Sequence, residues 1–365
     1  MVKVQDELRY LLALSSIPVI GPGTTRKLLN AFGTPENIFR APMKELLQVE
    51  GVGKGRAEGI ANFKAWGETD KVIGKCEKAG IRILYYKDAD YPVLLKEIPD
   101  HPLVLFMKGQ IREEDRYAIA IVGTRKASHY GISVTERFTS ELSSMGFTIV
   151  SGMARGIDTA AHRKAIQNNG STIAVLGSGV DVIYPPESAW LYRRIVEEGA
   201  VVSEFLPGTK PLRENFPVRN RLISGLSLGV LVVEASQRSG ALITAEFALE
   251  QGREVFAVPG NVMSSSFAGT HSLIQKGAKL VQSADDIVEE LRHILKGFVK
   301  SNKKVEIALD AEEKRLCCQI SHEPVHIDEI IRNSGVASSE ALTLLLGLEI
   351  KGVVRQIDGK KFQLV

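Results

Sequence analysis

The sequence predicts an α/β protein built on a doubly wound, Rossmann-like parallel sheet, with an N-terminal helical domain and a C-terminal winged helix. Between residues 117 and 295, short apolar runs alternate with helical segments. Buried parallel strands are apolar on both faces, so they form continuous runs rather than alternating patterns. Most of the runs lead within a few residues into Gly or Ser. The predicted strands are 118–123, 148–152, 172–177, 200–203, 229–234 and 254–260.

Residues 1–86 are predicted to form a domain of short amphipathic helices. Two segments are self-similar, because Gly-Pro-Gly at 21–23 and Gly-Val-Gly at 51–53 each precede a helix with Arg or Lys in its first turns. Such turns are typical of SAM-like or helix-hairpin-helix motifs, whose backbone amides bind phosphate without reading sequence. The alternative is a small helical domain whose glycines only make turns. Residues 87–116 are interpreted as a connecting segment.

The C-terminal part is predicted to be a linker followed by a winged helix. Residues 296–315 are rich in Lys and Glu, and residues 316–365 contain helices followed by two short strands around an Asp-Gly turn. The segment 338–346, where a recognition helix would lie, carries no basic residue. We therefore expect this domain to make partner or intramolecular contacts rather than to bind duplex DNA strongly.

Composition excludes several classes of protein. In 365 residues, 46 basic and 43 acidic side chains leave a net charge of +3, too little to bind nucleic acid by bulk charge, so any such binding needs a local patch. No run of 18 apolar residues predicts a membrane span, and no signal core opens the sequence, so we expect a cytoplasmic protein. Three cysteines without a Cys-x-x-Cys pair predict neither a disulfide framework nor a zinc site, and we expect no metal and no cofactor.

Glycine-containing loops follow several predicted strands, at 123–128, 151–156 and 177–181. The carboxyl ends of parallel strands meet at one edge of a sheet, where backbone amides and helix N-termini can approach an anion. One such loop is ordinary turn chemistry, but several at one edge predict a ligand site. The first loop lacks the Gly-x-Gly-x-x-Gly spacing, so dinucleotide binding is disfavoured.

The segment 208–225 is locally basic. It carries four cations against a single acid, Glu214, and has Phe216 in its middle. Cations pair with phosphates, and an exposed aromatic ring offers a base a stacking surface. The alternative is that Phe216 belongs to the core and that the arginines solvate a loop or pair with acids. For Asn220 and Arg221, a structural role between neighbouring loops is the preferred interpretation. The four cations are Lys210, Arg213, Arg219 and Arg221.

Taken together, these motifs resemble the DNA-processing protein A family (DprA, also called Smf). The resemblance is carried by motifs at 123–128, 151–158, 177–185, 216–225, 239–244, 257–260 and 269–278. It implies a single-stranded DNA-binding protein that dimerises through its Rossmann-like domain. It also implies that the protein protects incoming strands in natural transformation, loads the RecA recombinase on them and helps to displace single-strand binding protein. The predicted flanking domains agree with known members of this family.

The resemblance also implies which residues form the DNA site and the dimer. The DNA-binding residues come from three loops: Gly123, Arg125, Ser128, Gly152, Arg155, Lys210, Arg213, Phe216 and Arg219. Which of Lys210 and Arg213 contacts phosphate stays open. His271, Leu273 and Ile274 are the candidates for the dimer interface, although a helix that packs on its own sheet would use the same apolar residues.

An enzyme is the main alternative. The segment 239–246 is loosely similar to the phosphate loop of lysine-decarboxylase-like nucleotide phosphoribohydrolases, in which Glu246 would act as a general acid or base. The Pro-Gly-Gly signature of that loop is absent, however. Asp158 and His162 lie one helical turn apart, but a helix-capping role for Asp158 accounts for that spacing. We therefore predict a binding protein with no catalytic residue.

Overall fold

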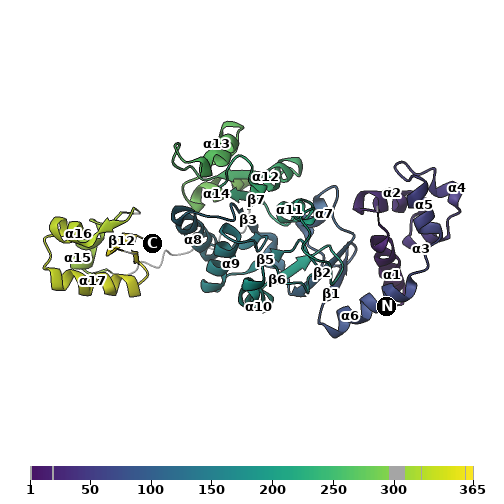
Figure 1. The fold of residues 1–365 in the computed structure, drawn as a ribbon, viewed down its shortest axis with the longest axis horizontal. Coiled ribbons are helices and arrows are strands. Elements are labelled where there is room, and N and C mark those ends of the chain that lie inside the picture. Colours follow the sequence, from purple (N-terminus) through teal and green to yellow (C-terminus); the bar gives the residue numbers. More distant parts are fainter. Residues whose placement is uncertain (1, 19, 296–308, 322, 358, 365) are drawn as a thin grey trace. The chain divides into compact units, whose positions relative to one another are not determined.

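A mixed sheet organises the larger part of the chain (Figure 1). The computed structural model describes residues 2–18, 20–295, 309–321, 323–357 and 359–364, and divides into two units, residues 1–300 and 301–365. Within the described part of the first unit, the sheet has nine strands in the order β1-β2-β6-β5-β4-β3-β7-β8-β9. Each unit is treated by itself below.

All six predicted strands are present, and they pair in parallel. After β3 the chain builds one half of the sheet outward through β4, β5 and β6, then returns to the other side of β3 with β7 and β8. This reversal is the doubly wound arrangement that the sequence predicts. The bounds are β3 Ala118–Val122, β4 Thr148–Ser151, β5 Thr172–Val175, β6 Ala200–Ser203, β7 Gly229–Val232 and β8 Glu254–Ala257.

The sheet extends beyond the six predicted strands. β2 (Val104–Gly109) pairs antiparallel with β6, and β1 (Arg82–Tyr85) pairs antiparallel with β2. The segment 87–116, expected to be a connection, therefore supplies a strand, and residues 82–85 of the expected helical domain supply another. At the opposite edge, the short β9 (Lys279–Leu280) pairs with β8. Gly109 is required at the end of β2, because a Cβ there would lie 2.2 Å from the Gly199 carbonyl oxygen.

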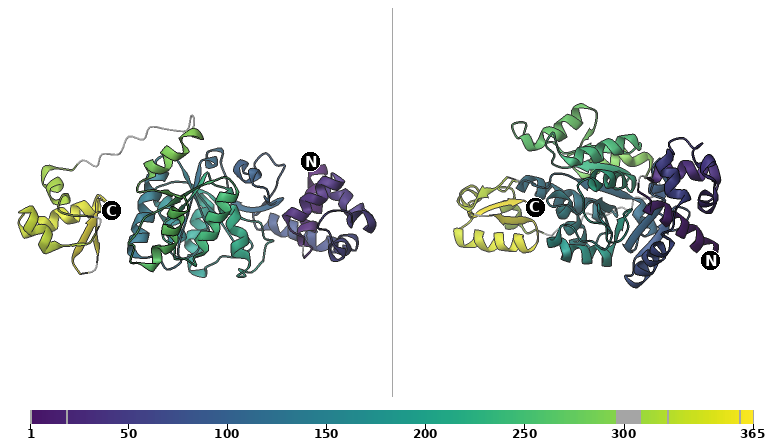
Figure 2. Two further views of the ribbon diagram at one scale, coloured as in Figure 1. Left: turned by 90° about the horizontal axis from the view of Figure 1, so that it is seen from above. Right: turned by 45° about the vertical axis from the view of Figure 1, so that its right-hand side comes forward.

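Helices cover both faces of the sheet (Figures 1 and 2). Ile119 and Ile121 point to one face and share a core with α8, α9 and α14, and α10 lies beside α9 on that side. Ala118, Ala120 and Val122 point to the other face, where α7, α11, α12 and α13 pack. The bounds are α7 Val93–Glu97, α8 His129–Ser144, α9 Ile157–Gln167, α10 Ala189–Glu198, α11 Asn215–Gly225, α12 Gly240–Glu250, α13 Ala268–Gln275 and α14 Ala284–Glu290.

The predicted N-terminal helices are present and lie ahead of β1. Pro22 is the first residue of α2, a position where its missing N–H costs nothing, and Gly53 caps the start of α5. Aromatic rings hold the helices together, with Trp66 edge-on to Tyr10 at 5.3 Å and to Phe63 at 4.9 Å between centroids. The bounds are α1 Val2–Ser16, α2 Pro22–Phe32, α3 Pro35–Arg40, α4 Met43–Leu46, α5 Lys54–Ala61 and α6 Trp66–Lys78.

The second unit has the winged-helix arrangement that the sequence predicts. Among its described residues, three helices pack on a small antiparallel sheet with strand order β10-β12-β11. Residues 296–308 of the expected linker, and residue 358 of the expected turn, lie outside the described residues, and α15 begins inside the rest of the expected linker. The bounds are α15 Ala311–Cys317, β10 Val325–His326, α16 Ile327–Ser334, α17 Ser338–Ile350, β11 Val354–Ile357 and β12 Lys361–Leu364.

Helix α17 occupies the place of a recognition helix. Its exposed side chains include Leu342 and Leu346, and none of its residues is basic. The helix thus lacks basic residues, as expected from the sequence, and it exposes the acidic Glu340 as well as these leucines. In the part of the chain that the structure describes, no helix is both long and apolar enough to cross a membrane.

Candidate nucleic-acid interface

A pocket lies at the carboxyl ends of the central strands. Its empty volume, counted with the open solvent above it, is about 400 Å³. The loops after β3, β4 and β5 meet there with the start of α11, because parallel strands all end at this edge. Four of the predicted site residues are brought together in it. The lining residues are Arg125, Gly152, Ala154, Arg155, Leu176, Gly177, Ser178, Tyr184, Pro185 and Phe216.

The half-buried Phe216 ring is an organising element of this pocket. The guanidinium carbon of Arg125 lies 5.2 Å from the ring centroid, within the range of a cation–π interaction. The Tyr184 ring is 5.7 Å away, tilted by 38°. Gly177 leaves room for the ring, because a Cβ there would lie 2.9 Å from its Cδ1 atom. The pocket therefore combines an aromatic surface with an exposed cation.

The position of Arg219 differs from its predicted role as a DNA contact. Its side chain is buried, and its Nη1 donates to the carbonyl oxygens of Gly152, at 2.9 Å, and of Val175. Burial lowers the pKa of Arg219 to about 10, against the opposing charge of Asp158. Its guanidinium carbon is 5.9 Å from the Phe216 centroid. Arg219 thus supports the pocket from within and does not present its charge to a ligand.

Asp158 completes this support. Its buried carboxylate accepts the backbone N–H groups of Gly152, at 3.1 Å, and Ala154, at 3.3 Å. Burial raises the pKa of Asp158 to about 6, while the nearby Arg219 guanidinium acts to lower it. Helix α9 begins after Gly156 without a side-chain cap, so the expected capping role of Asp158 is wrong. The carboxylate instead fixes the loop that follows β4.

His162 lies in the interior, away from the pocket lining. Its Nδ1 is 2.7 Å from the Thr172 hydroxyl, which itself donates to the Ile149 carbonyl oxygen at 2.7 Å. The Thr172 oxygen therefore accepts the Nδ1–H of the neutral imidazole. Burial lowers the pKa of His162 to about 3, and the charge of Arg219 acts in the same direction. The spacing of His162 and Asp158 is thus explained by two separate structural roles.

Ser128 and Gly123 also differ from their predicted role as DNA contacts. The Ser128 hydroxyl donates to Glu234 Oε2 at 2.8 Å and accepts the Gly131 N–H at 3.0 Å. Glu234 Oε2 also accepts the Ser128 N–H at 2.9 Å, so a buried carboxylate of this chain sits at the start of α8. A Cβ on Gly123 would lie 2.5 Å from Ile157 Cγ1, which shows that this glycine permits close contact between loop and helix. Neither Ser128 nor Gly123 lines the pocket.

The remaining predicted cations are exposed around the pocket. Arg155 lines it and forms an ion pair with Glu187, with Nε 2.5 Å from Oε1, and this hydrogen bond raises the pKa of Arg155. Lys210 and Arg213 lie in the loop before α11 and make no ion pair within the described part of the chain. Lys210 and Arg213 are therefore available to an anionic ligand in addition to Arg125, whereas the charge of Arg155 is already paired with Glu187.

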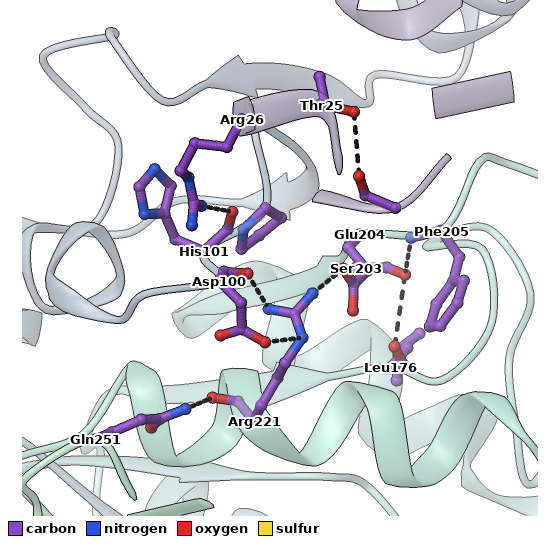
Figure 3. Close-up of polar contacts among 12 residues, drawn as sticks. Thr25, Arg26, Asp100, His101, Leu176, Ser203, Glu204, Phe205, Arg221 and Gln251 are labelled. Atoms are coloured by element: carbon purple, nitrogen blue, oxygen red, sulfur yellow. Dashed lines mark hydrogen bonds and ion pairs between the residues drawn. The ribbon is translucent and has the colours of Figure 1, made fainter. Parts of the chain in front are cut away.

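Arg221 holds two segments of the chain together, as expected from the sequence (Figure 3). Its guanidinium donates to Glu204 and to the Asp100 carbonyl oxygen at 2.8 Å, with Nε 3.2 Å from Asp100 Oδ2. Burial raises the pKa of Glu204 to about 7, against the effect of Arg221. Arg26 of α2 donates to the His101 carbonyl oxygen at 2.8 Å, which joins the N-terminal helices to the same segment.

The sequence predicts a ligand loop after β5, at 177–181 with Tyr184 and Pro185, without naming its residues as DNA contacts. Leu176, Ser178, Tyr184 and Pro185 line the pocket from this loop. Glu234 follows an apolar strand and gives no signal of its role in the sequence. Among the described residues, no three His, Cys, Asp or Glu side chains gather as a metal site would require.

The residues expected at a dimer interface lie on α13. Leu273 is buried in the core between α13 and the sheet, so it is not a surface residue. Ile274 is half-buried, and His271 Nε2 is 3.2 Å from the Gly260 carbonyl oxygen. Leu280, on the edge strand β9, is 43% exposed. Glu246, the residue on which a hydrolase would depend, is exposed on α12 and does not line the pocket.

The fold and the pocket define a class: multidomain proteins with a doubly wound domain whose sheet edge presents cations around an aromatic ring. The model of the family called DNA recombination-mediator protein A matches residues 82–292. A DprA winged helix domain matches residues 301–360, and a SAM-like helix-hairpin-helix tandem matches residues 11–63. The chain belongs to the DNA recombination-mediator protein A family.

Individual relatives agree with this assignment. Protein Smf of Synechocystis is 34% identical and covers 98% of this chain and 99% of its own length. DNA processing protein DprA of Streptococcus pneumoniae is 48% identical over 56% of this chain and 72% of its own. A crystal structure of DNA processing protein A from S. pneumoniae superposes with a TM-score of 0.67 at 38% identity, over 77% of this chain and 96% of that one.

A structure of DNA processing protein A from Helicobacter pylori, described for its single-stranded DNA binding mode, superposes with a TM-score of 0.53 at 28% identity. It covers 59% of this chain and 96% of its own.

Proposed function

We propose that this protein binds single-stranded DNA and acts as a recombination mediator in natural transformation. The observation that carries the proposal is the Phe216 ring, half-buried at the sheet edge with Arg125 5.2 Å from its centroid. An aromatic surface beside cations is the combination that single-strand-binding sites use. The family assignment and the single-stranded DNA binding described for the H. pylori protein support it.

The site divides binding between two kinds of contact. Arg125, Arg155, Lys210 and Arg213 neutralise phosphates, and Phe216 stacks a base, worth about 1–3 kcal/mol. Arg155 contacts Glu187 through Nε, so a phosphate would meet its two Nη groups or displace Glu187. None of these side chains is placed to read a base edge, so binding has little sequence preference. Arg219 and Asp158 contribute by holding the loop after β4 in place.

The finer steps of the proposal concern partners. The protein protects incoming strands in the cytoplasm, displaces single-strand binding protein and loads RecA on the strand. It acts as a homodimer whose interface includes the half-buried Ile274 and His271 on α13 and the neighbouring exposed Leu280 on β9. Because Leu273 lies in the core, it supports this surface from below and is not itself a contact.

The position of Glu246 does not support the nucleotide hydrolase alternative. A general acid or base must lie within hydrogen-bonding distance of the reacting group. Glu246 is exposed on α12, outside the pocket that the exposed cations surround. We therefore propose that the protein binds a polymer and consumes nothing.

A binding measurement tests the proposal. Fluorescence anisotropy with a labelled oligonucleotide should show tighter binding to the single strand than to a blunt duplex of the same length. The logarithm of the affinity should fall with the logarithm of salt concentration with a slope of roughly −0.7 for each phosphate neutralised, or about −3 for four contacts. Phe216→Ala should weaken binding by about 1–3 kcal/mol. Equal affinity for both forms of DNA would contradict the proposal.

A further inference from the structure

Trp190 is a large aromatic side chain that the fold leaves in solvent. It is 57% exposed, whereas tryptophan is highly buried on average in folded proteins. In the described part of the chain no aromatic ring stacks on it, in contrast to Trp66, which packs against Tyr10, Phe39 and Phe63. We propose that Trp190 is a second base-stacking platform, and that a single strand runs from the Phe216 pocket across Arg155 to Trp190 and Arg193. This inference rests on the proposed function.

The topology places Trp190 at the edge where the pocket lies. Helix α10 carries the chain from the carboxyl end of β5 back to the start of the parallel strand β6, so α10 begins at the carboxyl edge of the sheet. Trp190 is the second residue of α10. The short helix η2 (Pro186–Ser188) leads directly into α10 and follows Pro185, which lines the pocket. Four residues of chain, 186–189, therefore separate a pocket residue from Trp190.

Buried contacts fix the backbone that carries Trp190. The next two residues, Leu191 and Tyr192, point inward and are buried. The Tyr192 hydroxyl donates to the Val180 carbonyl oxygen at 2.6 Å, which ties α10 to the loop that lines the pocket. The Ser188 N–H donates to the Pro185 carbonyl oxygen at 3.0 Å. The indole is thus presented from a fixed position, as a preorganised binding group requires.

A continuous surface connects the pocket with Trp190. Glu187, Trp190 and Arg193 follow one another at intervals of three residues on successive helical turns, a spacing that makes side chains neighbours. Glu187 accepts from Arg155 with Nε 2.5 Å from Oε1, so a residue of the pocket reaches the start of this surface.

Arg193 completes the surface as a candidate phosphate contact. It is exposed and makes no ion pair with the residues that the structure describes. An aromatic ring for a base with a cation nearby for a phosphate repeats, along the strand, the combination found at Phe216 and Arg125. Exposed tryptophans also serve as anchors between proteins. Continuity with the pocket through Arg155 favours the nucleic acid, and Trp190 emission that the longer strand leaves unquenched would favour a protein contact instead.

The chain offers a direct spectroscopic test, because it contains only two tryptophans, Trp66 and Trp190. The emission that is lost in Trp190→Phe reports on Trp190 in the otherwise native protein. We expect oligothymidylate of about 20 nucleotides to quench this component to saturation, and oligothymidylate of about 5 nucleotides, held at the pocket, to leave it unquenched. Trp190→Ala should weaken binding of the longer strand by about 5- to 100-fold and of the shorter strand by less than about twofold.

Matched variants separate the possible outcomes. Val93→Ala, which shortens another exposed apolar side chain on the opposite face of the sheet, should change neither affinity. Trp190→Phe should retain most of the binding, because a phenyl ring still stacks. If the wild type binds both oligomers but Trp190→Ala binds the longer one equally well and its emission is unquenched, the inference is wrong and the proposed function stands. If the wild type binds neither oligomer, both are wrong.

Discussion

The guanidinium carbon of Arg219 lies 5.9 Å from the centroid of the Phe216 ring, although the two residues have opposite surroundings. Arg219 is buried and bound to backbone carbonyl oxygens, whereas Phe216 lines the pocket. Arg125 is exposed and also lies near the ring, at 5.2 Å. The site thus uses one arginine to support the aromatic surface and another to face the ligand, which leads to separable predictions.

Arg219→Ala should lower stability and binding together. The substitution removes two hydrogen bonds to the carbonyl oxygens of Gly152 and Val175 and leaves the buried Asp158 without its opposing charge. Leaving a buried polar group without its partner costs about 1–3 kcal/mol. Urea unfolding should show this loss as a lower midpoint with an unchanged slope.

Arg125→Ala is the matched comparison. We expect it to weaken single-strand binding by about 1.5–3 kcal/mol, the value of a hydrogen bond to a charged group, with wild-type unfolding. The division of roles is wrong if Arg219→Ala unfolds like the wild type, or if Arg125→Ala binds like it.

Gly177→Ala should weaken DNA binding without removing any charge. A Cβ on Gly177 would lie 2.9 Å from Cδ1 of Phe216 and 3.2 Å from Cε1, closer than carbon atoms tolerate, so the ring must move. We expect part of the stacking contribution of about 1–3 kcal/mol to be lost, measured by anisotropy. Gly240→Ala is the control, since a Cβ there has no neighbour within 4 Å. Unchanged affinity in Gly177→Ala would show that the ring position does not matter for binding.

The fold could be predicted wherever one physical rule determined it. Six parallel strands followed from apolar runs, because burial on both faces demands them. Strands β1 and β2 were missed, because they lie outside the alternation of strands and helices that marks the parallel part of the sheet and they extend that sheet antiparallel, although residues 103–107 form an apolar run. The two-residue β9 is too short to leave any periodic signal.

The site was predicted in residue type but not in side-chain direction. Phe216 and Arg219 are three residues apart at the start of α11, so their side chains neighbour each other while only one reaches the pocket. Sequence gives the charge of Arg219, but burial depends on the strands beneath it. The prediction that Ser128 contacts DNA was wrong for a related reason: its hydrogen-bond partner Glu234 is 106 positions away in the sequence.

His162 predicts a specific acid sensitivity. Burial lowers its pKa to about 3 in the folded state, so below its ordinary value of 6.5 the unfolded chain binds the proton more tightly. The free energy of unfolding should therefore fall as the pH drops from about 6.5 toward 3, by up to about 1.4 kcal/mol per pH unit. In His162→Gln, residue 162 cannot bind this proton in the unfolded chain, so this contribution to the pH dependence is absent.

The two stability curves should converge as the pH is lowered. Asp158, whose raised pKa of about 6 acts in the opposite direction, is present in both proteins and cancels in the comparison. Urea unfolding at a series of pH values measures both curves. Parallel curves would show that the imidazole is protonated in the folded protein.

Two neighbouring residues of α13 should respond differently to a charge. Leu273 is buried in the core, so Leu273→Arg should lower the thermal midpoint sharply or give insoluble protein. Ile274→Arg, on a half-buried side chain beside the proposed dimer surface, should give a soluble and folded monomer by light scattering. A folded dimer of unchanged affinity in Ile274→Arg would place the interface elsewhere.

Glu246→Gln separates a binding protein from a hydrolase. Glu246 is exposed on α12 outside the pocket, so its substitution should change strand binding by no more than about 0.5 kcal/mol, the usual range for a surface residue. Wild type and variant should release neither base nor phosphate from nucleoside monophosphates or oligonucleotides, with or without magnesium. Chromatography of the products measures this. Any turnover that co-purifies with the wild type and disappears in Glu246→Gln would favour the hydrolase, whereas the absence of turnover combined with retained binding agrees with a site that holds a strand without cleaving it.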